Sequence, residues 1–153
     1  MKPSPGSFYL DTCLLISLFH NDSGYAAAEA WVVAAPEAEL WISHWVLLEF
    51  ASATAVRCRR GDLSPARLEV VQAALTLFCR ERLGMLEPRG EDFSQARSWL
   101  EGDASLGLRA ADTLHLALAQ RYGTTLLSAD QTLVRAAQGM GLKTALVRQT
   151  DDA

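Results

Sequence analysis

Four acidic residues stand where a globular protein ordinarily places apolar side chains. Asp11 directly follows the strand-like segment SFYL, and Asp130 follows TTLLSA. Glu49 and Asp112 interrupt two apolar helical patterns, HWVLLEFASA and LRAADTLHLALA. Burying a carboxylate is costly unless it is paired, hydrogen-bonded or protonated. These acids are therefore the first candidates for chemistry.

Each acid also has a purely structural interpretation. Asp11 and Asp130 suit helix N-caps. Asp112 could pair with Arg109, three residues earlier, and Glu49 could face water. These interpretations weaken together, because carboxylates that converge on one edge raise one another's pKa values. A divalent cation removes that conflict, and oxygen ligands without a His or Cys cluster favour Mg²⁺ or Mn²⁺ over zinc. We therefore expect a metal site formed by Asp11, Glu49, Asp112 and Asp130.

Such a cation keeps coordination positions for a phosphate, so phosphodiester hydrolysis is the chemistry that it suggests. Hydroxyl groups stand beside the acids at Thr12, Thr113 and Ser128. We expect them to orient a carboxylate or a metal-bound water, although Ser and Thr near strand ends also serve as turn and cap donors. His115, one helical turn after Asp112, is expected to be a core or supporting imidazole rather than a ligand.

Short strand candidates alternate with helical patterns along the whole chain. The strands are expected at 7–10, 39–43, 84–88, 124–128 and 143–147, and the helices at 23–35, 43–61, 64–84, 91–102, 108–123 and 128–141. Ser23 and Ser64 are expected N-caps, with Pro65 in the first turn and Gly84 as a terminator. The alternation predicts one α/β domain over 1–153, a three-layer α/β/α sandwich with a mostly parallel sheet. Ligands of such sheets bind beyond the carboxyl ends of the strands.

Composition narrows the class further. A net charge of −4 over 153 residues fits neither a disordered segment nor a strongly basic nucleic-acid binder. Cys13, Cys58 and Cys79 form no C-x-x-C motif, so we expect reduced, mostly buried thiols. We find neither a signal peptide nor an apolar run of the ~18 residues that a membrane helix needs. The expectation is a cytoplasmic protein with no membrane contact.

The segments YLDTCLLISLF, ISHWVLLEFASA, LRAADTLHLALA and LLSADQTL, in this order, resemble those of the PIN domain ribonucleases, and more narrowly the VapC-like toxins of bacterial toxin–antitoxin pairs. The resemblance implies a PIN-type sandwich that cleaves RNA endonucleolytically with Mg²⁺ or Mn²⁺ at the four acids. Thr12 matches the family's hydroxyl after the first Asp, whereas Cys13 departs from the commoner Ser or Asn. The implied partners are RNA, a small antitoxin over the active-site groove, and a second copy in a homodimer.

Two rival functions remain. A phosphatase with an aspartyl nucleophile could also begin with a strand and Asp11, but it wants a second acid two residues later, where Cys13 stands. A noncatalytic binding module of the same fold is the other rival. The presence of all four acids argues against the second, since a degenerate site tends to lose charge first.

Basic and apolar residues leave two further alternatives open. Of the 14 basic residues 12 are Arg, which suits phosphate contacts, although a GC-rich coding sequence gives the same bias. Arg57, Arg59 and Arg60 end a helix, where the helix dipole favours them, or they line an RNA-binding rim with Arg80, Arg82 and Arg109. Apolar residues cover more than one face of the segment 41–83, either as inter-helix core or as a groove for a partner helix.

Overall fold

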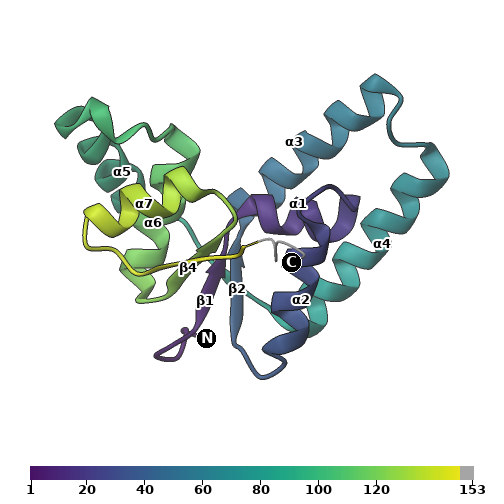
Figure 1. Cartoon of the computed structure of the whole chain (residues 1–153), viewed down its shortest axis with the longest axis horizontal. Helices are drawn as coiled ribbons and strands as arrows, with labels where there is room; N and C mark the ends of the chain where they lie inside the picture. Colours follow the sequence, from purple (N-terminus) through teal and green to yellow (C-terminus); the bar gives the residue numbers. More distant parts are fainter. Residues whose placement is uncertain (149–153) are drawn as a thin grey trace, which may run out of the picture.

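The computed structural model of the chain describes residues 1–148 and has a central parallel sheet with helices on both faces (Figure 1). The strands are β1 (Phe8–Leu10), β2 (Leu40–Ser43), β3 (Leu83–Leu86), β4 (Thr125–Ser128) and β5 (Thr144–Leu146). Their order is β3-β2-β1-β4-β5, and every pair of neighbours is parallel. The predicted α/β/α sandwich is confirmed.

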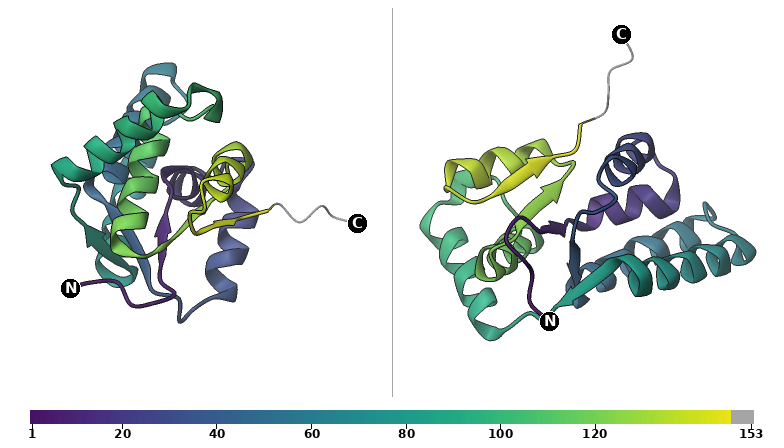
Figure 2. Two further views of the ribbon diagram at one scale, coloured as in Figure 1. Left: turned by 90° about the vertical axis from the view of Figure 1, so that its left-hand side faces the viewer. Right: turned by 90° about the horizontal axis from the view of Figure 1, so that it is seen from below.

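The helices form two layers, which Figures 1 and 2 show from three sides. One layer contains α1 (Thr12–His20), α2 (Tyr25–Ala34), α3 (His44–Arg60) and α4 (Pro65–Arg82); the other contains α5 (Gly90–Gly102), the 3₁₀-helix η1 (Ala104–Leu106), α6 (Ala110–Tyr122) and α7 (Gln131–Gly139). From β1 the chain runs outward through β2 to β3, and it then returns to β4 on the other side of β1. The carboxyl ends of β1 and β4 therefore flank the topological switch point, where open α/β sheets bind ligands.

Local sequence signals account for the ends of α3 and α4. The Ser43 hydroxyl accepts the backbone N–H of Val46 at 3.3 Å and so caps α3. Gly61 ends that helix with a left-handed φ of 79°, which glycine adopts without strain. Ser64 caps α4 as predicted, with Pro65 in the first turn.

Two expected helix boundaries were wrong. The N-cap of α2 is Gly24 and not Ser23. Helix α4 ends at Arg82, and Gly84 lies within β3 instead of terminating the helix. A Cβ atom at Gly84 would collide with the indole ring of Trp41 on the neighbouring strand, so this glycine is required by close packing and not by a turn.

The core lies between the sheet and the two helix layers. Tyr9, Ile42 and Leu126 from the strands and Leu15 and Leu118 from the helices are fully buried. Every residue of α6 from Thr113 to Ala119 is buried, so α6 lies against the sheet and brings its first turn to the strand ends. In the described part of the chain no helix is long and apolar enough to cross a membrane. The three cysteines are unpaired and partly buried.

Candidate active site

Asp11 follows the last residue of β1 and is 7% exposed. It occupies the N-cap position of α1, yet its side chain makes no capping hydrogen bond. Its Oδ2 atom instead accepts the Ser128 hydroxyl at 2.6 Å and the Cys13 thiol at 3.3 Å. The capping interpretation of Asp11 is therefore wrong, and this carboxylate is held by the end of β4.

Asp130 combines a structural role with a free oxygen. Its Oδ1 atom accepts the backbone N–H groups of Thr132 at 2.9 Å and Leu133 at 3.1 Å, which caps α7. Its own backbone N–H donates to the Ser128 hydroxyl at 3.0 Å. Within residues 1–148, nothing donates to Oδ2. Ser128 thus links Asp130 to Asp11, because it accepts from one and donates to the other.

Asp112 lies in the first turn of α6, where its Oδ2 atom accepts the backbone N–H of Arg109 at 2.9 Å. The contact with Arg109 is therefore a capping bond to the backbone. Burial raises the pKa of Asp112, and the negative charges of Asp11 and Asp130 raise it further against the opposing bond from Arg109. Like charges act in this way only at short range, so the three aspartates share one edge of the sheet.

Glu49 lies in the second turn of α3 with its side chain 27% exposed. Its Oε1 atom accepts the Thr12 hydroxyl at 2.8 Å and the His115 Nε2–H at 2.6 Å. Burial opposes ionisation of Glu49, but the hydrogen bonds from His115 and Thr12 outweigh it and hold the pKa of Glu49 below its usual value. His115 Nε2 is also 3.8 Å from Asp11 Oδ1, so His115 lies between Glu49 and the aspartates.

The three hydroxyl groups expected beside the acids do not behave alike. Thr12 bonds to Glu49 and Ser128 to Asp11. Thr113 contacts no carboxylate of the described residues, because its hydroxyl donates to the backbone carbonyls of Arg109 at 3.2 Å and Ala110 at 3.0 Å. A threonine in the first turn of a helix readily makes such a local bond, and the sequence pattern does not exclude it.

Cys13, where the resemblance led us to expect Ser or Asn, lies beside Asp11. Burial, followed by the negative charge of Asp11, raises the pKa of Cys13 to about 12. The side chain is therefore a neutral thiol, which can donate to the Asp11 carboxylate as a hydroxyl or amide would.

The donor chemistry of this edge fits a hard divalent cation. Within residues 1–148, no hydrogen-bond donor contacts Asp11 Oδ1, Asp112 Oδ1 or Asp130 Oδ2. No three His, Cys, Asp or Glu side chains of the described residues are arranged as a compact metal cluster. Mg²⁺ needs no such cluster, because one or two carboxylates and several waters hold it.

Sequence reasoning missed two residues behind the site. Tyr9 and Ser43 are fully buried, and the Tyr9 hydroxyl lies 2.7 Å from Ser43 Oγ and 2.8 Å from His115 Nδ1. The available signal was the position of each polar side chain near the end of a central strand. Buried polar atoms in a sheet must find a partner.

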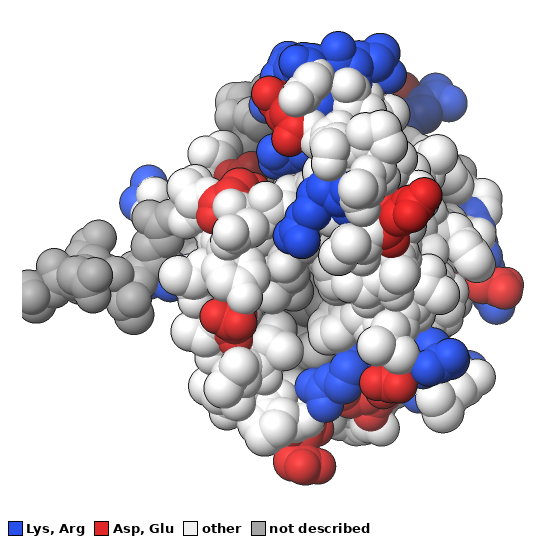
Figure 3. Space-filling model, turned by 90° about the vertical axis from the view of Figure 1, so that its right-hand side faces the viewer, with Lys and Arg blue, Asp and Glu red and all other residues white. Residues whose placement is uncertain are grey.

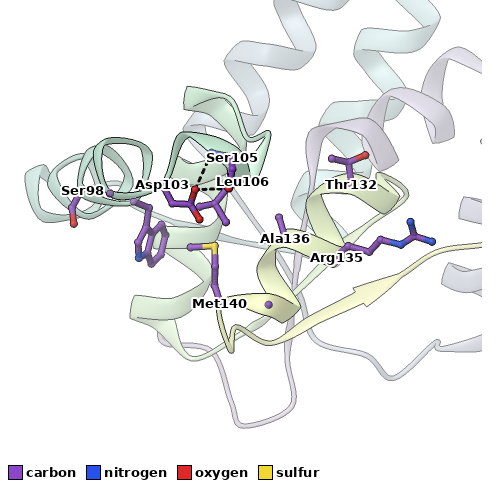
Figure 4. Close-up of a pocket in the computed structure, with 11 residues that line it drawn as sticks. Ser98, Asp103, Ser105, Leu106, Thr132, Arg135, Ala136 and Met140 are labelled. Atoms are coloured by element: carbon purple, nitrogen blue, oxygen red, sulfur yellow. Dashed lines mark hydrogen bonds between the residues drawn. The ribbon is translucent and has the colours of Figure 1, made fainter.

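A cavity of about 740 Å³ lies between the α5–η1 segment and α7 (Figure 4). Its lining includes Thr132, whose N–H donates to Asp130, and the neighbouring Arg135 and Met140. In Figure 4 the side chain of Arg135 points away from Asp103. Arg135 forms no ion pair within residues 1–148 and is a cation that the sequence analysis did not select.

Three of the arginines that the sequence analysis selected lie farther from the acids. Arg57, Arg59 and Arg60 form the last turn of α3, and Arg57 is about 12 Å beyond Glu49 along the helix axis, at roughly 1.5 Å per residue. Figure 3 shows the face of the molecule that α3 and α4 form, and basic side chains gather at its top, over the turn between these two helices. Arg109 lies beside Asp112 and is exposed.

The parallel sheet, the two helix layers and the acids at the carboxyl ends of the central strands define an α/β/α protein with an acidic site at its topological switch point. A family model described as "PIN domain" matches residues 8–139. The chain belongs to the PIN domain family. No curated protein matches the sequence.

Solved structures share this fold at low sequence identity. A Mycobacterium tuberculosis VapC20, described as a sarcin–ricin loop cleaving toxin, has a TM-score of 0.71 and 18% identity over 94% of this chain and 100% of its own. VapBC2 from Rickettsia felis, bound to a DNA fragment from its promoter, has a TM-score of 0.65 and 20% identity. The match covers 92% of this chain and 98% of that one. A toxin–antitoxin complex from Klebsiella pneumoniae has a TM-score of 0.64 and 17% identity. The match covers 94% of this chain and 100% of that one.

Proposed function

We propose that the protein is a metal-dependent endoribonuclease and the toxin of a VapBC-like toxin–antitoxin pair. The observation that carries the proposal is the placement of Asp11. It is buried at the switch point without capping its helix, and its charge and that of Asp130 raise the pKa of Asp112. Membership of the PIN domain family and the described activity of VapC20 support RNA as the substrate.

Asp11, Glu49, Asp112 and Asp130 would hold Mg²⁺ or Mn²⁺. When bound, such a cation polarises the scissile phosphate, acidifies an attacking water and stabilises the departing alkoxide. The chain orients the carboxylates for this task. Ser128 and Cys13 fix Asp11 through Oδ2, and Thr12 and His115 fix Glu49 through Oε1, so each of these two acids keeps one oxygen without a donor among residues 1–148.

RNA cleavage is expected to require Mg²⁺ or Mn²⁺ and to stop when EDTA is added. Gel analysis of a labelled RNA incubated with the purified protein measures this directly, with a generic phosphomonoester in parallel. Undiminished cleavage in EDTA would contradict the proposed dependence on a metal ion. Release of phosphate from the monoester alone would favour the phosphatase, and metal-independent RNA binding without cleavage would favour the noncatalytic module.

The layer formed by α3 and α4 supports an antitoxin as partner. Val46 and Val71 belong to the core, as one of the two interpretations of this segment required. The other apolar side chains leave a cavity of about 490 Å³ between the helices, lined by Leu47, Phe50, Ala55, Leu68 and Leu75, among others. A groove of this kind suits the apolar face of a partner helix. The homodimer implied by the resemblance stays a prediction, which the mass in solution tests.

Replacing Arg57, Arg59 and Arg60 by Gln is expected to weaken RNA binding. The plot of log binding constant against log salt concentration should also become less steep, by up to about 2 in slope, since each phosphate contact on single strands contributes roughly 0.7. Binding titrations at several salt concentrations measure the slope. Arg97→Gln is the control, because Arg97 is exposed and pairs with Glu101 on α5. An unchanged slope in the triple variant would assign these arginines to the helix end alone.

A further inference from the structure

A chain of buried hydrogen-bonding groups runs from the β2–α3 junction to Glu49. Ser43 and Tyr9 are completely buried and His115 is 1% exposed. Ser43 Oγ lies 2.7 Å from the Tyr9 hydroxyl, which lies 2.8 Å from His115 Nδ1. His115 Nε2 lies 2.6 Å from Glu49 Oε1. Tyr9 and Ser43 have no role in the function proposed above.

If the imidazole of His115 is neutral, the protons of this chain have one consistent direction. Ser43 Oγ accepts the backbone N–H of Val46, so its own proton is free to donate to the Tyr9 oxygen. The Tyr9 O–H then donates to His115 Nδ1, and the imidazole carries its proton on Nε2. A distance of 2.6 Å to a carboxylate requires that N–H, because two facing lone pairs would repel.

We propose that Tyr9, through His115, is a positioning residue for Glu49: the tyrosine fixes the Nε2–H tautomer of His115, and this N–H locks Glu49 Oε1. The inference deepens the proposed nuclease site and rests on it only for the consequence for cleavage. It assigns Glu49 Oε2 as the oxygen offered to the cation.

The environment of Glu49 explains why such a lock is needed. Its side chain is partly exposed on α3 and has several rotatable bonds, so holding it in one conformation costs conformational entropy. Thr12 and His115 both donate to Oε1, while within residues 1–148 no group donates to Oε2. Two donors on one oxygen fix the carboxylate plane, which the second oxygen needs before it can serve a ligand that demands regular geometry.

The tautomer is tested first, without metal or RNA. Nitrogen-15 NMR of histidine-labelled protein should show His115 protonated at Nε2 and bare at Nδ1. In Tyr9→Phe the Nδ1 atom loses its donor, so the single tautomer should give way to a mixture. Protons on both nitrogens of the wild type, or an unchanged His115 spectrum in Tyr9→Phe, would overturn the proposal.

The consequence for the site is tested with two substitutions of similar size. His115→Gln places an amide N–H near the position of Nε2, whereas His115→Asn places its amide near Nδ1 and cannot reach Glu49. Supporting residues of metal sites typically contribute about 10–100-fold in metal affinity or activity. We expect His115→Asn and Tyr9→Phe to lose this amount in Mn²⁺ affinity by calorimetry and in kcat, with little change in KM, and His115→Gln to recover most of it.

Tyr25→Phe is the control, because within residues 1–148 the Tyr25 hydroxyl bonds only to the nearby Glu29, and this variant should behave as wild type. Equal losses in His115→Gln and His115→Asn, with melting temperatures lowered in parallel, would mean that the chain serves the fold and not Glu49. A wild-type protein that binds Mn²⁺ and shows the predicted tautomer but cleaves no RNA would contradict the proposed function and leave the positioning of Glu49 intact.

Discussion

Asp11→Asn is expected to lower RNA cleavage by about 100-fold or more and to leave the metal-free protein at least as stable as the wild type. The loss follows because an amide is a poor ligand for a hard cation and removes a charge that stabilises the transition state. The stability is kept because Asn retains the shape and can still accept the Ser128 hydroxyl. Removing one negative charge also relieves part of the repulsion that, after burial, raises the pKa of Asp112, and this favours the metal-free fold.

Thermal melts with and without Mg²⁺ measure the stability, and an RNA assay measures the activity. Added Mg²⁺ should raise the melting temperature of the wild type by mass action and that of Asp11→Asn much less. Asp11→Ala is a less clean variant, since Ser128 would keep a buried hydroxyl without its acceptor, at a cost of about 1–3 kcal/mol. Full activity in Asp11→Asn, or equal Mg²⁺ stabilisation of both proteins, would remove Asp11 from the metal site.

The sheet and the approximate positions of the acids followed from local sequence signals. The period of the apolar residues and the turn residues between them placed all five strands within a residue or two of their observed bounds. The order of acids along strands and helices then sufficed to bring Asp11, Asp112 and Asp130 to one edge, because parallel strands end on the same side.

Contacts that depend on the register between distant elements did not follow from the sequence. Tyr9 meets His115, and Asp11 meets Ser128, across more than a hundred residues. No local pattern distinguishes a capping aspartate from one that leaves its helix uncapped, as Asp11 does. Gly84 was assigned to a helix end because the bulk of Trp41 on the neighbouring strand is invisible in one dimension.

Two aspartates in the same local setting show how the fold separates a structural acid from a site acid. Asp92 and Asp112 both lie in the first turn of a helix and accept the backbone N–H of the arginine three residues earlier, Arg89 or Arg109. Asp92 is 2% exposed and has the guanidinium of Arg121 as a partner. Asp112 has no such partner within residues 1–148 and faces two further carboxylates. Only the second arrangement calls for a cation from outside the chain.

Arg121→Met is expected to destabilise the protein by about 3 kcal/mol, since it leaves the Asp92 carboxylate buried and unpaired. Arg121 Nε and Nη2 donate to the two oxygens of Asp92 at 2.6 and 2.8 Å, and Nη2 also donates to the Glu87 carbonyl at 2.8 Å. For about 150 residues this loss corresponds to a fall of roughly 6–12 °C in melting temperature. Calorimetry or a fluorescence melt measures it.

Arg97→Met is the matched control, because Arg97 also pairs with a carboxylate at 2.6 Å, that of Glu101, but both side chains are exposed. Such pairs within a helix contribute only about 0.3–0.5 kcal/mol. The double variant Asp92→Asn/Arg121→Met should recover part of the stability, since no charge is left buried. Below its melting temperature Arg121→Met should still bind Mn²⁺ with the affinity of the wild type, because Arg121 contacts none of the four acids at the sheet edge. Similar destabilisation by Arg97→Met and Arg121→Met would show that burial of Asp92 does not set the energy of this pair.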